Sequence, residues 1–210
     1  MANQSGQIYG LTILSPIIEN DGIDICHATA LRWYLAGLPR DHTSPLAQVS
    51  STHFARLVVM DDVVFVGAPA CEEHLKSRYL VFETNFDGDI DQYLTDMARK
   101  IPVFVDSVWK HCVGYPGTEP GAFAAYMKKC QVETTFFFAD VNDKTVEQTL
   151  KALQVQSALT HFIATNQGKP ATQIQKAFGV LLECLAKAPT PPPGGLNHEK
   201  TPAEDRPYDR

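Results

Sequence analysis

This chain of 210 residues lacks the features that assign a membrane or a secreted protein. No apolar run approaches the roughly 18 residues that a membrane-spanning helix needs. Residues 1–10 contain no basic stretch followed by an apolar one, so we expect no secretory signal. A surplus of positive charge is missing as well, because the formal net charge is −6 at pH 7. That balance argues against nucleic acid or a membrane surface as a partner.

Motifs that name a reaction are also missing. The sequence has no P-loop, no GxGxxG and no Gly-x-Ser-x-Gly, so nothing in it favours an NTPase, a dinucleotide-binding protein or a hydrolase. It has no HExxH or HxxxH pair and no carboxylate cluster with metal-ligand spacing. No single motif therefore identifies the function.

Cysteine is scarce and scattered. The five cysteines are an odd number, they are widely spaced and they include no CxxC pair: Cys26, Cys71, Cys112, Cys130 and Cys184. Such a set fits reduced thiols better than a disulfide framework. We therefore expect a cytoplasmic protein.

The sequence does contain enough apolar material for a folded core. Hydrophobic residues make up 44% of the chain, and 11 Phe, 7 Tyr and 2 Trp are among them. The length predicts one domain, which we place at residues 1–188. Residues 189–210 are rich in proline and polar residues and predict a disordered tail.

Hydrophobic periodicity predicts the order strand, helix, strand, strand, helix, strand. The expected strands lie at 8–18, 53–66, 79–86 and 132–140; the expected helices include 23–38, a helix starting near Asp89 and two C-terminal helices within 145–187. This order is typical of an α+β fold, the ferredoxin-like antiparallel sheet with helices on one face. Its other face needs a cover, which can be the sheet of a second copy in a homodimer, the C-terminal helices, or a ligand.

Three segments carry a family resemblance: Thr52–Val59, Tyr79–Gly88 and Trp109–Pro116. Over residues 8–165 the chain resembles a poorly characterised family of bacterial proteins. That family is similar to the dimeric α/β-barrel superfamily, which includes monooxygenases of antibiotic-biosynthesis type, chlorite-dismutase-like haem proteins and dye-decolorising peroxidases. The resemblance implies a small-molecule oxidoreductase, either with haem as a cofactor or with none. The peroxidase haem signature begins with a glycine that this chain lacks before Asp87-Gly88, which speaks against peroxidase chemistry.

His111 is the first candidate for a catalytic or cofactor-binding residue. It lies at the end of a predicted helix, before the loop Gly114–Gly117. A neutral imidazole there can act as a general base, or as the axial metal ligand if haem is bound. The alternative is a histidine that only interacts with the helix dipole. Tyr115, in the same loop, is assigned as a cofactor contact.

The strands at 53–66 and 79–86 supply the other candidates. Alternation predicts that Arg56 lies on one face of its strand and His53 on the opposite face. Arg56 suits a clamp for a substrate carboxylate or a haem propionate; the alternative is a structural salt bridge to Glu83. Glu83 and Asn85 share a face that either lines a cavity or is solvated. His53, Arg56, Glu83 and Asn85 are the predicted binding residues on the sheet.

Two classes of function follow. The first is an enzyme, an oxidoreductase acting on a small molecule in a pocket between sheet and helices, with His111 and Arg56 as catalytic residues. The second is a non-catalytic ligand-binding or accessory protein, which the lack of any nucleophile–base spacing favours.

Overall fold

The structure is a computed structural model, which describes residues 3–19, 25–64, 67–68 and 73–194. The elements in these ranges are β1 (Gln4–Ser5), β2 (Ile8–Pro16), α1 (His27–Ala36), the short 3-10 helix η1 (Pro45–Gln48), β3 (Thr52–Met60), β4 (Tyr79–Asp87), α2 (Ile90–Lys100), α3 (Pro102–Trp109), α4 (Pro120–Lys129), β5 (Gln131–Val132), α5 (Val146–Asn166) and α6 (Ala171–Lys187). The predicted α+β class is confirmed.

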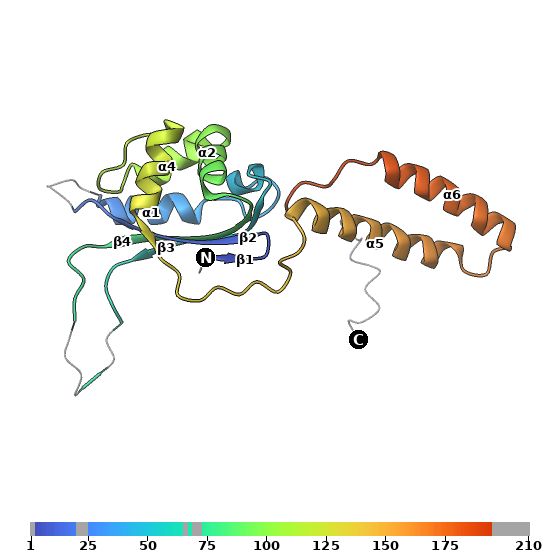
Figure 1. Cartoon of the computed structure of the whole chain (residues 1–210), viewed down its shortest axis with the longest axis horizontal. Helices are drawn as coiled ribbons and strands as arrows, with labels where there is room; N and C mark the ends of the chain where they lie inside the picture. Colours follow the sequence, from blue (N-terminus) through green and yellow to red (C-terminus); the bar gives the residue numbers. More distant parts are fainter. Residues whose placement is uncertain (1–2, 20–24, 65–66, 69–72, 195–210) are drawn as a thin grey trace.

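The strands form one antiparallel sheet with the order β1–β2–β4–β3, and β5 pairs with β2 beside β1. Helices α1, α2 and α4 cover one face of this sheet, as Figure 1 shows. We call the opposite side the open face. None of the helices in the described ranges combines the length and the apolar composition that crossing a membrane requires.

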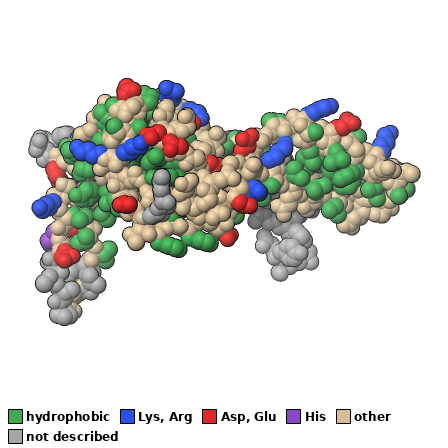
Figure 2. Space-filling model, in the orientation of Figure 1, with side chains coloured by type: hydrophobic (Ala, Val, Ile, Leu, Met, Phe, Trp, Pro, Cys, Tyr) green, Lys and Arg blue, Asp and Glu red, His purple; other side chains and the backbone are tan. Residues whose placement is uncertain are grey.

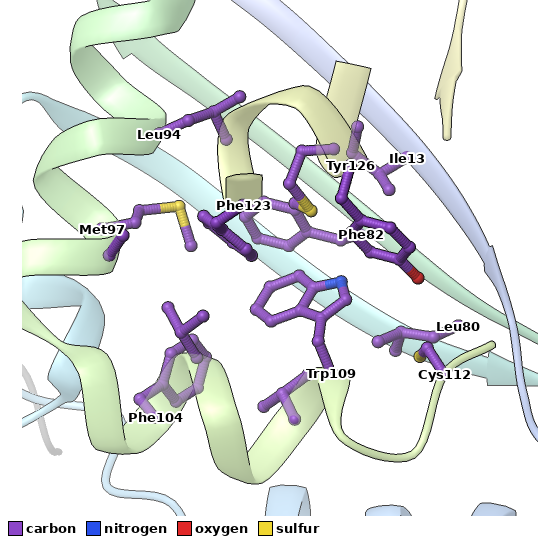
Figure 3. Close-up of a cluster of buried hydrophobic side chains, with 14 of the residues drawn as sticks. Ile13, Leu80, Phe82, Leu94, Met97, Phe104, Trp109, Cys112, Phe123 and Tyr126 are labelled. Atoms are coloured by element: carbon purple, nitrogen blue, oxygen red, sulfur yellow. The ribbon is translucent and has the colours of Figure 1, made fainter. Parts of the chain in front are cut away.

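Strict alternation along β4 separates the two faces. Leu80, Phe82, Thr84 and Phe86 are fully buried under the helices, whereas the residues between them are half-buried on the open face. Trp109 of α3 lies at the centre of this core, and its indole meets the ring of Phe82 edge-on at 5.4 Å between centroids (Figure 3). The core therefore lies between one sheet face and its helices.

The helix caps follow local sequence. Asp89 caps α2, because its carboxylate accepts hydrogen bonds from the backbone N–H groups of Asp91 and Gln92. Thr145 caps α5 and forms a reciprocal capping box with Gln148. Asp and Thr are both common N-cap residues, because their side-chain oxygens accept hydrogen bonds from the unpaired backbone N–H groups of the first turn.

The predicted strand at 132–140 is wrong beyond Val132. Asn3 O accepts a hydrogen bond from Gly10 N at 2.8 Å and β1 pairs with the next residues of β2, so this edge of β2 is already occupied. β5 can therefore pair only with Thr12 and Ile13. The run Phe136–Phe138 lies outside the sheet, and Phe136 and Phe138 are exposed.

Residues 133–142, which we call the strap, run instead beside the open face. Ala139 N donates to Ser5 Oγ, and Gln7 N donates to Asn142 O at 2.8 Å. The ring of Phe137 lies directly over Gly10, where a Cβ atom would come within 2.8 Å of it. Glycine is therefore required on this side of β2, and the strap covers only the β1–β2 half of the open face.

Two other expected boundaries differ. β3 ends at Met60 instead of continuing to 66, and Asp61 turns out of the sheet to pair with Arg32 and Arg78. α1 begins at His27, whereas the expected start at 23 lies outside the described residues. The part of the expected tail at 195–210 lies outside them as well.

Helices α5 and α6 form a hairpin that extends away from the sheet instead of covering it (Figure 1). At its start, Val146 N donates to Asp87 Oδ2 of β4 at 2.7 Å. At its end, Lys151 Nζ donates to Ala188 O at 2.7 Å, so the chain after α6 returns along α5. Residues 190–193 then border a cleft of about 380 Å³ beside η1 and α5.

Candidate functional site

The β3–β4 half of the open face carries three of the four predicted sheet residues. Arg56 lies opposite Glu83, and Phe54 lies opposite Asn85. Phe54 and Val58 flank Arg56 on the same face and are 47% and 43% exposed. The predicted grouping of Arg56, Glu83 and Asn85 is therefore found on one surface.

Arg56 forms an ion pair with Glu83, in which its Nη2 donates to Glu83 Oε2. The Arg56 side chain is 59% exposed and that of Glu83 is 30% exposed. The guanidinium thus has an anionic partner within the chain and remains hydrated. This arrangement corresponds to the salt-bridge alternative for Arg56.

His53 does not lie where alternation places it. A β-bulge between Thr52 and Phe54 shifts the register of β3, so the side chain of His53 turns toward Asp87. His53 Nε2 and Asp87 Oδ1 are 2.6 Å apart, and the other Asp87 oxygen accepts from Val146 N. The prediction that His53 lies on the opposite face from Arg56 is wrong, and His53 instead pairs with the carboxylate that accepts a hydrogen bond from the first residue of α5.

His111 lies away from the open face, beside α1. Its Nδ1 is 3.0 Å from Nδ1 of His27, the first residue of α1, and the two rings meet edge-on with centroids 5.3 Å apart. Burial lowers the pKa of His111, and the neighbouring positive charges of His27 and Lys110 lower it further. The neutral form of His111 is therefore favoured.

Tyr115 is also separate from the sheet residues. Its ring packs edge-on against Tyr126 of α4, with 6.2 Å between centroids. Burial and the negative charge of Asp106 raise its pKa to about 12. The predicted site residues therefore form two separate groups. His53, Arg56, Glu83 and Asn85 lie on the sheet, and His111 and Tyr115 lie beside the helices.

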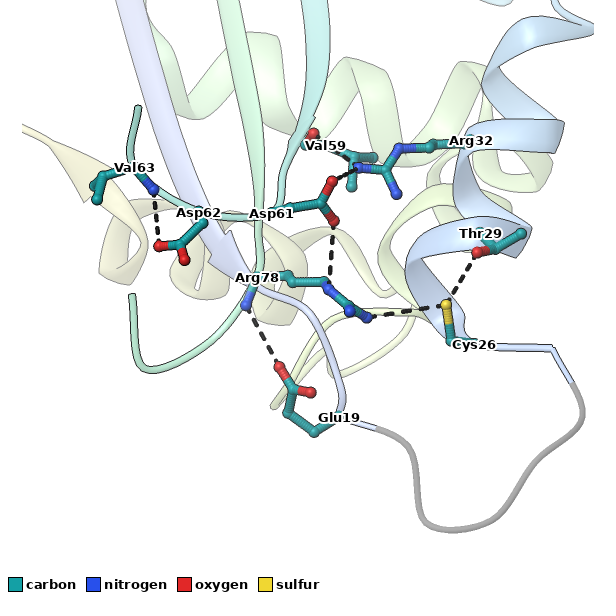
Figure 4. A network of polar contacts seen from close by, with 9 residues as sticks. All are labelled: Glu19, Cys26, Thr29, Arg32, Val59, Asp61, Asp62, Val63 and Arg78. Atoms are coloured by element: carbon teal, nitrogen blue, oxygen red, sulfur yellow. Dashed lines mark hydrogen bonds and ion pairs between the residues drawn. The ribbon is translucent and has the colours of Figure 1, made fainter. Parts of the chain in front are cut away.

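A polar network at the start of α1 was not anticipated from the sequence (Figure 4). Cys26 Sγ lies 3.0 Å from Thr29 Oγ1, and Arg78 Nη1 donates to the same sulfur at 3.9 Å. The hydrogen bond with Thr29 is the main cause that lowers the pKa of Cys26, and the charge of Arg78 adds to it. Arg78 is in turn held by Asp61, with 3.3 Å between Nε and Oδ1. These residues are too far apart in sequence to form a motif.

Cofactor binding is limited by this geometry. Within the part of the chain that the structure describes, no three His, Cys, Asp or Glu side chains converge on a common metal position. A haem with His111 as axial ligand and Arg56 on a propionate requires both residues on one side of the sheet, and they lie on different sides. The residues do not fit that arrangement, and the haem stays a prediction.

Comparisons with family models, with curated proteins and with solved structures find no match to this chain. The family resemblance of the three segments therefore stays a prediction. The functional argument rests on the geometry.

Proposed function

We propose that the chain is a non-catalytic binding or accessory protein that acts as a homodimer, joined through the open faces of two ferredoxin-like units. The observation that carries this proposal is the β3–β4 half of the open face. Phe54 and Val58 are exposed there beside an internally neutralised ion pair. Apolar side chains grouped on a sheet face are typical of an interaction surface.

The strand order supports the ferredoxin-like unit. The first and third long strands, β2 and β4, are central, β3 lies at one edge, and β5 lies beside β1 at the other. This is the arrangement in which two split βαβ units share a sheet. In such a sheet the face opposite the helices is the natural surface for a partner.

Charge favours a second copy as the partner. In a two-fold interface the same patch meets itself, so a residue of one chain contacts a different residue of the other. Arg56 and Glu83 are adjacent and opposite in sign, and a two-fold axis between them brings each Arg56 toward the Glu83 of the second chain. The patch is therefore complementary to itself.

Light scattering coupled to size exclusion tests the proposal. We expect a dimer for the full chain at micromolar concentration and a monomer for Phe54→Glu and Val58→Glu. Trp33→Glu is the matched control, because Trp33 is 63% exposed but lies on α1, on the helical side. A monomeric wild type contradicts the proposal, as does a Trp33→Glu variant that dissociates equally.

An oxidoreductase acting on a small molecule is the second candidate. It is favoured by the His27–His111 contact beside Cys26, whose thiol pKa is lowered by Thr29. A hydrogen-bonded imidazole pair can pass a proton between its ring nitrogens. A Soret band in haem-reconstituted protein that disappears in His111→Ala supports the haem form of this candidate, and its absence contradicts that form.

A further inference from the structure

The two histidines that meet beside α1 are positioned by rigid parts of the fold. His111 directly precedes the buried Cys112, and its carbonyl oxygen accepts a hydrogen bond from Ile18 N at 3.0 Å. Val113 N donates to Pro16 O at 2.8 Å. The backbone at His111 and just after it is therefore hydrogen-bonded to the end of β2 and the residues that follow it. His27 opens α1, a helix of 10 residues that packs on the sheet. The contact between the rings therefore joins two fixed backbones.

The separation of the ring nitrogens matches a metal-ligand pair. Two nitrogens 3.0 Å apart, each about 2.0–2.1 Å from a shared ion, subtend an angle of about 95° at that ion. This is the angle between neighbouring ligands in square-planar or octahedral coordination. A tetrahedral ion needs the nitrogens about 3.4 Å apart at the same bond lengths. The pair thus suits tetragonal ions better than tetrahedral Zn²⁺.

We propose that His27 and His111 form a two-histidine binding site for a late first-row divalent metal ion, with Cu²⁺ as the preferred ion. The ion replaces the proton that the two Nδ1 atoms share, and water completes its coordination. Imidazole is a suitable ligand for Cu²⁺ and Ni²⁺, and the general affinity order places Cu²⁺ above both Ni²⁺ and Zn²⁺. The site is separate from the open face and does not depend on dimer formation.

Cys26 precedes His27 but is not a third ligand in this arrangement. Its sulfur is directed at Thr29 and Arg78, as Figure 4 shows. A thiolate ligand selects softer ions such as Cu(I). With the imidazoles of His27 and His111 as ligands, the expected preference is for Cu²⁺, then Ni²⁺, with no binding of Mg²⁺.

Calorimetric titration of the full chain with Cu²⁺, Ni²⁺, Zn²⁺ and Mg²⁺ tests this site. We expect each of His27→Gln and His111→Gln to weaken Cu²⁺ binding by roughly tenfold or more, because even the residues that support metal ligands contribute that much. His53→Gln is the control, since His53 is paired with Asp87 on the sheet. Ni²⁺ is titrated in parallel because Cu²⁺ oxidises free thiols. Unchanged Cu²⁺ and Ni²⁺ affinity in both variants overturns the proposal.

A second measurement on the wild type avoids any dependence on variant folding. Substoichiometric Cu²⁺ broadens the NMR signals of the rings closest to it. We expect the ring signals of His27 and His111 to broaden first and together. Earlier broadening of other histidine rings overturns the site, as does broadening of only one of the two.

Discussion

The sheet with its helices and the α5–α6 hairpin differ sharply in how they bury apolar side chains. The core cluster extends from Leu11 to Met127 and includes all the large fully buried side chains. In the hairpin only Val146 is buried, at the first residue of α5, and α6 contains no buried residue. Both regions contain amphipathic helices. Hydrophobic periodicity is therefore enough to form a helix, but a second layer of structure is needed to bury its apolar side.

The hairpin consequently exposes its apolar residues. Ile163, Val180 and Leu182 are each more than half exposed, and Figure 2 shows hydrophobic side chains gathered on this part of the surface. Phe162 and Phe178 contact each other across the two helices, with 5.6 Å between ring centroids. Local capping and the bonds of Lys151 hold the hairpin ends, whereas packing holds the sheet domain.

The largest expected effect is on the core of the sheet domain. Trp109→Ala should lower the free energy of unfolding by about 3–5 kcal/mol, because it leaves a cavity among Phe82, Phe104 and Phe123. Phe178→Ala in the hairpin should cost at most about 1 kcal/mol, because its side chain is 40% exposed and loses mainly the contact with Phe162. Urea unfolding followed by far-UV circular dichroism measures both. Equal losses contradict the comparison.

Two Gly→Ala substitutions should change the free energy of unfolding in opposite directions. Gly10→Ala pushes the new Cβ against the ring of Phe137, which should cost about 1–3 kcal/mol and release the strap. Gly179→Ala in α6 meets open space and removes a flexible residue from a helix, which should stabilise it by roughly 0.5–1 kcal/mol. Thermal melts give the signs, and limited proteolysis within 133–142 reports the strap. A Gly10→Ala protein with a resistant strap contradicts the Phe137 contact.

Arg56→Met should have a smaller effect. It leaves Glu83 without its partner, but in the single chain the pair is largely solvated, so at a concentration where the protein is monomeric we expect a loss of at most about 1 kcal/mol. Thermal melts of the wild type and the variant measure it. A loss several times larger in the monomer would contradict the solvated ion pair and would rule out a role for Arg56 as a ligand clamp.

Thiol labelling should distinguish the two regions without changing stability. Burial raises the pKa of Cys112 to about 12, so at pH 8 only about one molecule in ten thousand carries the reactive thiolate. Cys184 of α6 is exposed and should be alkylated quickly. Cys26 has a lowered pKa, so its labelling rate should reach a plateau at lower pH than that of an ordinary thiol. Mass spectrometry of iodoacetamide-treated protein measures the rates, and fast labelling of native Cys112 contradicts its burial.

Most helices and strands could be predicted from the sequence. Apolar residues such as Leu80, Phe82 and Phe86 occupy every second position of the strands, and apolar residues recur at the helical period in the helices. It did not predict the end of the sheet at Val132, because a two-residue strand without any apolar pattern takes the edge of β2. Because β1 and β5 share this edge of β2, residues 133–142 leave the sheet and form the strap.

The candidate site was predictable only in part. Arg56 and Glu83 face each other because regular alternation holds there, whereas His53 escapes it through a bulge that has no sequence signal. His27 and His111 are 84 residues apart, and they meet because α1 packs against α3 and the chain after α3 is bonded to the end of β2. Contacts between residues that are distant in sequence depend on tertiary structure, and hydrophobic periodicity gives no information about it.

Native-state hydrogen exchange compares the two regions most directly. We expect the amides of Phe82 in β4 and Leu94 in α2 to exchange only through global unfolding, with the full free energy of unfolding as their protection. The amides of Phe162 in α5 and Leu181 in α6 should exchange through local opening, with much smaller protection. Equal protection of all four amides would contradict the claim that the sheet domain alone carries the packed core.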